Sequence, residues 1–141
     1  MFLTNPETHY PIINPQTKLP PSGIYLAKIT SATLYEVEAA EESQRFCLAL
    51  EYLLVSEDSF DIFSFTETIY PFSTSPRGQK YRSYLEKHYP NLGDFWELEG
   101  SREKLFIEME VFGGYAYPVV VKRKLIARSP FYDPACEKNS N

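Results

Sequence analysis

The segment Phe60–Tyr89 constrains the fold more than any other part of this 141-residue chain. It begins as an alternating, threonine-rich run that is typical of a β-strand, and Pro71 ends that run. Ser75 and Pro76 then favour a helix start, because serine caps the first turn and proline fits the first helical position. The segment therefore predicts one long strand followed by one amphipathic helix.

Apolar runs before and after this segment predict four more strands. With it, the predicted strands cover 24–33, 46–55, 60–70, 104–112 and 115–126. Gly113 and Gly114 favour a two-residue hairpin between the last two strands, because both positions of such a turn accept positive φ. The alternation in the fourth strand predicts inward positions for Leu105, Ile107, Met109 and Val111.

The resulting order of three strands, one helix and two strands predicts a mainly β fold. A five-stranded OB-like antiparallel barrel, with its one helix between strands three and four, satisfies this order. Closure would also remove the exposed edges of phenylalanine-rich strands. The alternative is an open antiparallel sheet with the helix packed on one face. We assign the barrel domain to residues 23–128, between a proline-rich extended arm (1–22) and a polar C-terminal tail (129–141).

Composition and motifs exclude several function classes. No apolar run approaches the ~20 residues of a membrane span, and no secretory signal begins the chain, so we expect a cytoplasmic protein without a membrane partner. Two cysteines, Cys47 and Cys136, and two histidines, His9 and His88, are too few and too scattered to predict a metal site or a cofactor. Catalytic serine and phosphate-loop motifs are absent, which predicts a protein that is not an enzyme.

Charge is segregated along the chain, although the net charge is only −5. Nine acids and one base lie from Glu36 to Glu67, whereas four bases and no acid lie from Lys122 to Arg128. Such segregation creates local fields that the net charge conceals.

The run Leu19–Ile29, in which Pro20, Pro21 and Gly23 precede an alternating strand, resembles the opening of small OB-fold proteins encoded by phages and mobile elements. The later elements follow the same pattern through Phe46–Val55, Phe60–Tyr70, Ser75–Tyr89, Leu98–Gly100 and Leu105–Val111. The similarity is one of pattern and covers about residues 19–126. It implies a single-stranded DNA-binding protein or a relative of one. We therefore predict low-specificity binding of single-stranded nucleic acid in replication or recombination of such an element.

Single-strand binding requires aromatic platforms for bases and cations along the backbone path. The candidate stacking residues are Phe63, Phe65, Tyr115 and Tyr117. The candidate phosphate-binding residues are Arg77, Lys80, Lys122, Arg123, Lys124 and Arg128. Each group also has a structural interpretation that involves no ligand. The two phenylalanines suit a barrel core, and the basic run suits a solvated edge strand.

One departure from the OB pattern supports a rival hypothesis. OB-folds bind ligands on strands two and three and on the adjoining loops, but the first such loop here, Tyr35–Gln44, is acidic where phosphate contact requires Lys or Arg. The rival is a protein–protein interaction module with no nucleic-acid ligand. Its acidic loop would meet a basic partner, or its proline-rich arm would add to the sheet of another subunit.

Overall fold

The computed structural model describes residues 19–39 and 41–132, so most of the predicted arm and tail, including His9 and Cys136, lies outside the described residues. The elements in this part of the chain are β1 (Gly23–Glu36), η1 (Glu42–Gln44), β2 (Phe46–Ser56), β3 (Ile62–Ile69), α1 (Pro76–His88), η2 (Phe95–Leu98), β4 (Arg102–Phe112) and β5 (Tyr115–Ala127). Elements η1 and η2 are short 3-10 helices. The predicted mainly β class and the predicted order of strands and helix are confirmed.

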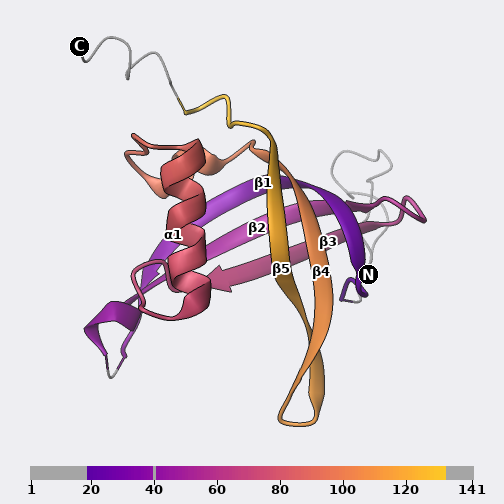
Figure 1. Cartoon of the computed structure of the whole chain (residues 1–141), viewed down its shortest axis with the longest axis horizontal. Coiled ribbons are helices and arrows are strands. Elements are labelled where there is room, and N and C mark those ends of the chain that lie inside the picture. The colour runs from indigo at the N-terminus through magenta and orange to yellow at the C-terminus, as the bar shows by residue number, and fades with distance from the viewer. Residues whose placement is uncertain (1–18, 40, 133–141) are drawn as a thin grey trace, which may run out of the picture.

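The five strands of the described chain form one antiparallel sheet in the order β3-β2-β1-β4-β5. The central strand β1 pairs with β4 through Gly23–Lys28 and with β2 through Tyr25–Glu36. A register shift between Ile29 and Ser31 interrupts the pairing of β1 with β2, and shifts of this kind bend a strand. The sheet is strongly curled, and β4 and β5 cross in front of β1–β3 (Figure 1).

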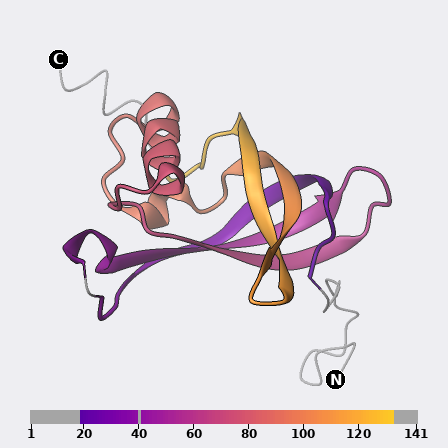
Figure 2. The same cartoon turned by 60° about the horizontal axis from the view of Figure 1, so that its bottom comes forward.

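The prediction of a closed barrel is wrong. Among the described residues no backbone pairing joins the edge strands β3 and β5. Helix α1 lies beside these two edges, over the inner side of the curled sheet (Figure 2). Its Tyr81 is buried in the core, and Tyr84 and Leu85 pack against the core. The alternative prediction, an open antiparallel sheet with the helix on one face, describes this arrangement.

Side chains link the two edge strands where the backbone does not. The guanidinium of Arg123 on β5 donates from Nη2 to Glu67 Oε2 on β3 at 2.6 Å and from Nη1 to the Tyr52 hydroxyl at 3.0 Å. Its central carbon lies 4.9 Å from the centre of the Tyr81 ring on α1. Glu103 on β4 is also buried, with one carboxylate oxygen 3.8 Å from Arg123 Nη1. We call Arg123, Glu67, Glu103, Tyr52 and Tyr81 the Arg123 cluster.

Helix α1 begins as predicted. Ser75 Oγ accepts a hydrogen bond from Gly78 N at 3.2 Å, and Pro76 occupies the first helical position. There is no room for a side chain at Gly78, because a Cβ at this position would lie 2.7 Å from the carbonyl oxygen of Tyr70. The cap and this close approach fix the start of α1 against the end of β3.

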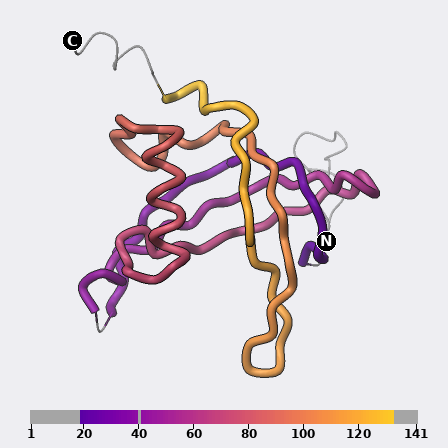
Figure 3. Tube along the Cα trace, viewed as in Figure 1, coloured from indigo at the N-terminus to yellow at the C-terminus, as the bar shows by residue number. Residues whose placement is uncertain are grey.

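Two expectations for β4 are wrong. Met109 and Val111 are exposed, because the β4–β5 hairpin extends beyond the other strands (Figure 3). Glu103 takes a buried position at the opposite end of the strand. The turn itself is as predicted: Gly113 and Gly114 have φ values of 57° and 85°.

The first residues of the predicted tail pack on the domain. Tyr132 is buried, and its ring meets that of Tyr89 edge-to-face at 4.8 Å. The backbone N–H of Ser129 donates to the Tyr89 hydroxyl at 3.0 Å. These contacts hold the chain after β5 against the segment that follows α1.

We expect Arg123→Met to lower the free energy of unfolding by about 3–5 kcal/mol, because it leaves two buried carboxylates without a counter-charge. Chemical denaturation measures this change. The matched control is Lys124→Met, which removes the neighbouring exposed charge and should change stability by less than ~0.5 kcal/mol. Equal effects of the two substitutions would show that the Arg123 cluster does not hold the edges together.

Glu103 makes stability depend on pH. Burial raises the pKa of its carboxyl above the ordinary value of 4.5, although Arg123 and the hydroxyl of Tyr84 act in the opposite direction. The folded chain therefore binds this proton more tightly than the unfolded chain does, so the group's contribution is full below pH 4.5 and is lost as the pH rises through the folded pKa. Glu103→Gln should remove this decline in urea denaturation at several pH values. A variant profile parallel to that of the parent would contradict the assignment.

Candidate nucleic-acid interface

Cations from three strands gather on one face of the sheet. In the strand pairing, Lys28 lies opposite Arg102, and Lys104 lies between Leu26 and Lys124. Residues directly opposite one another in an antiparallel pair share a face. Arg128 follows β5 and lines a groove of about 560 Å³ together with Lys28 and Arg102. We use the term basic face for the six residues Lys28, Arg102, Lys104, Lys122, Lys124 and Arg128.

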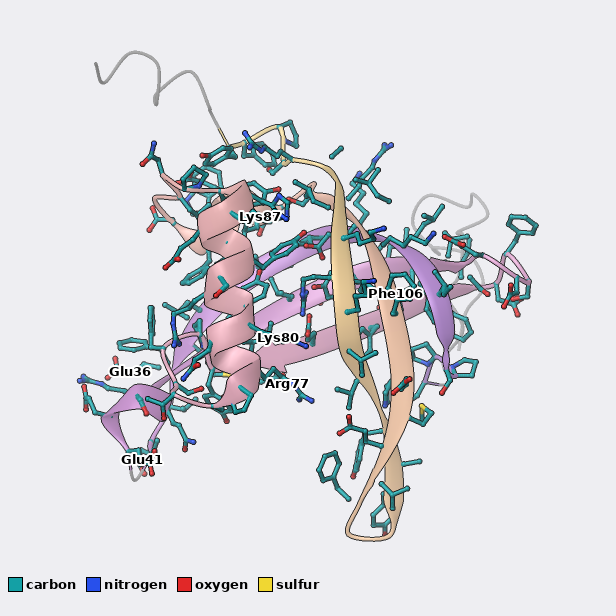
Figure 4. All side chains as sticks on the ribbon, viewed as in Figure 1. Glu36, Glu41, Arg77, Lys80, Lys87 and Phe106 are labelled. Atoms are coloured by element: carbon teal, nitrogen blue, oxygen red, sulfur yellow. The ribbon has the colours of Figure 1, made fainter. Side chains whose placement is uncertain are left out.

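The basic face is only partly neutralised. Its single ion pair within the described residues joins Lys104 to Glu57 at 3.3 Å. Lys104 and Lys122 lie 5.9 and 5.3 Å from the centre of the Phe106 ring. Figure 4 shows the position of Phe106 on the curled sheet. Like charges opposite one another, such as Lys104 and Lys124, destabilise a sheet. A cluster of this kind is typical of a surface that binds an anion.

Exposed aromatic rings lie at both ends of the basic face. On the hairpin, Phe112, Tyr115 and Tyr117 are 56%, 69% and 46% exposed. At the other end of β5, Phe131 lines the groove of the basic face, and the Trp96 ring lies 5.9 Å from it. Both of these rings are about half exposed. Rings and cations are the two components that single-strand binding requires.

Two carboxylates interrupt the path between the hairpin rings and the cations. Glu108 lies opposite Val119, and Glu110 lies opposite Tyr117. These acids repel phosphate, so the hairpin and the basic face form two separate contact areas.

Three of the ten sequence-predicted binding residues are not on the surface. Phe63 and Phe65 are 2% and 7% exposed and belong to the core, as their alternative interpretation states. The Arg123 side chain is 12% exposed and is ion-paired with Glu67. None of the three can reach a base or a phosphate in this conformation.

The other seven predicted residues fall into two groups. Lys122, Lys124 and Arg128 are part of the basic face, and Tyr115 and Tyr117 are on the hairpin. Arg77 and Lys80 instead lie on the side of α1 that faces β5 (Figure 4). They line a groove of about 590 Å³ with Pro76, Gln79, Ser83 and Val119–Val121, which we call the helix groove.

Six residues of this surface were not predicted from the sequence, namely Lys28, Arg102, Lys104, Trp96, Phe112 and Phe131. Lys28 lies far from the other cations in the sequence, and only the pairing of β1 with β4 brings it to them. Arg102 and Lys104 are two residues apart and share a side of β4, but the predicted strand began only at Lys104.

The acidic loop lies away from the basic face. Glu36 and Glu41 lie beyond α1, on the side opposite to Phe106 (Figure 4). Arg45 pairs with Glu36 at 2.6 Å and with Glu42 at 3.0 Å. The strands that carry the ligand in OB-folds, β2 and β3, contain no Lys or Arg. Any phosphate contact is therefore expected on β4, β5 and the first half of β1.

Comparisons with known protein families, with curated proteins and with solved structures find no match. Within the described ranges, none of the helices has the length and apolar character needed to cross a membrane. The same part of the chain holds no group of three or more His, Cys, Asp or Glu side chains that is placed to bind a metal ion. The function is therefore inferred from the surface itself.

Proposed function

We propose that this protein binds single-stranded nucleic acid, with low sequence specificity, through the basic face and the rings at its two ends. The observation that carries the proposal is the strand register, which brings five cations to one face of the sheet, with Arg128 in the adjoining groove. Cations attract the phosphate backbone, and exposed rings stack on any base because every base has a π-face.

The ligand is a single strand because stacking requires unpaired bases. Each stacked base contributes ~1–3 kcal/mol, a term that a duplex with its bases already stacked does not gain. We propose DNA as the ligand on the resemblance of the chain to OB-fold single-stranded DNA-binding proteins. We further propose that the protein serves replication or recombination of a phage or mobile element.

The arrangement of the sheet supports an OB-like assignment. An OB-fold is a partly open five-stranded barrel, and pairing of β3 with β5 would close one here. The binding surface differs from the usual one, since it uses β4, β5 and the start of β1. The acidic β1–β2 loop, on which the rival interaction module rests, does not border this surface and so does not oppose the ligand.

Salt dependence tests the basic face. We expect Arg102→Ala/Lys124→Ala to flatten the slope of log K against log salt for oligo-dT by about 1.4, since each contacted phosphate contributes about 0.7 for a single strand. Trp96 fluorescence at several salt concentrations measures the affinity. The control, Arg77→Ala/Lys80→Ala, removes the same charge from the helix groove and should leave the slope unchanged. Equal slopes for both double variants, or binding that ignores salt, would reject the basic face.

Stacking is tested on the hairpin. We expect Tyr115→Ala/Tyr117→Ala to weaken oligo-dT binding at least about thirtyfold, because it removes two stacking rings that contribute at least ~1 kcal/mol each. The salt slope should not change, since no charge is removed. Phe60→Ala deletes a 76% exposed ring in the β2–β3 turn and serves as the control. If that control weakens binding as much, the hairpin is not a contact.

A further inference from the structure

The geometry points to a second binding site: we propose that the helix groove accepts an extended acidic peptide of a partner protein, which adds as a strand to the free edge of β5. This site lies along the edge of β5, toward α1, and shares only Lys122 with the basic face.

The free edge of β5 is the first observation. Among the described residues β4 is the only strand paired with β5. An edge strand carries a row of unpaired backbone N–H and C=O groups along its outer side. Helix α1 does not cover this edge at Val119–Val121, because these residues line the helix groove with Pro76, Arg77 and Lys80.

The charge of the groove defines its partner. Arg77 and Lys80 line it from α1, and Lys122 lines its inner part from β5. No Asp or Glu lines either part. Arg77 and Lys80 make no ion pair within the described part of the chain. These cations complement acidic side chains.

The inner part of the groove favours apolar side chains as well. It is a cavity of about 200 Å³ lined by Tyr81, Tyr84 and Val120, among others. Side chains of an extended strand point alternately to its two sides. A segment that alternates acidic and apolar residues therefore fits the cations and the cavity together while its backbone pairs with β5.

The accessible edge is short. At the N-terminal end of this edge, Pro118 has no backbone N–H to donate. At its C-terminal end, the register shift beside Val121 disturbs the regular hydrogen-bond ladder. Residues Val119–Val121 are what remains for pairing, which suits a short linear segment rather than a whole strand of a folded partner.

The groove favours a peptide over nucleic acid. It lies at a strand edge, and its two aromatic residues are buried (Tyr81) or half-buried (Tyr84). Tyr81 is buried, and the Tyr84 hydroxyl donates to Glu103 at 2.7 Å. No ring in the groove is open for stacking on a base, which single-strand binding requires.

The test uses the full chain and a fluorescein-labelled heptapeptide that alternates glutamate and valine. We expect saturable binding by anisotropy and slower hydrogen exchange of the outward-facing amides within Val119–Val121. A peptide that alternates lysine and valine should not bind. The acidic peptide with N-methylated backbone amides keeps its charge but cannot donate to the edge, so its binding should be lost.

Two double variants separate this site from the basic face. Arg77→Ala/Lys80→Ala should weaken peptide binding about fivefold, the effect of two partly screened ion pairs. Arg102→Ala/Lys124→Ala should leave peptide binding unchanged, the reverse of the pattern expected for oligo-dT.

Three results would overturn the proposal. If the N-methylated peptide binds equally well, the peptide is held by charge attraction and does not add as a strand. Protection of Val119–Val121 by oligo-dT and not by the peptide would assign the groove to nucleic acid. Absence of acidic-peptide binding to a chain that still binds oligo-dT would reject this site and leave the proposed function standing.

Discussion

The contact of Arg123 with Glu67 allows an unclosed sheet to enclose one core. The two residues belong to the edge strands β5 and β3, which share no backbone pairing, and their side chains meet at 2.6 Å. A buried ion pair adds little net stability over a well-packed apolar pair, but it demands a particular geometry. Here that geometry fixes the separation of the two edges. Tyr81 of α1 packs against the same guanidinium, so the helix is positioned by the contact that positions the strands.

One extra residue in β5 places Arg123 in its cluster and adds Lys122 and Lys124 to the basic face. The two-residue turn sets Phe112 opposite Tyr115, and counting back from it without interruption would set Lys104 opposite Arg123. The register shifts beside Val121, so that Arg123 instead lies opposite the buried Leu105 and Lys124 lies opposite Lys104. Without the shift Arg123 would stand on the outer face and its two lysine neighbours would point into the core. A β-bulge of this kind re-aims side chains, and here it sorts three consecutive cations between two roles.

The sequence predicts the local features of this fold and not the long-range ones. Strand runs, the Ser75 cap and the Gly113–Gly114 turn depend on neighbouring residues, and each was predicted. Barrel closure was mispredicted because it depends on how two distant edges meet. The alternation of apolar residues predicted an inward position for Met109, but such a pattern cannot show where a hairpin extends beyond the other strands of its sheet. On the candidate site, Lys122 and Lys124 came from a local run, whereas Lys28 required the pairing of β1 with β4.

The two proposed binding surfaces both involve β5, because this strand departs from a regular closed barrel in two ways. The register shift gives its outer face the cations that attract phosphate. Because β5 does not pair with β3 in the described chain, its edge toward α1 has no backbone partner. The net charge of −5 does not oppose the first surface, because exposed charges are screened within ~8 Å at physiological salt and the acidic loop lies beyond α1. Because one surface uses the face of β5 and the other its edge, the two proposed ligands would compete only at Lys122, the one residue that both surfaces share.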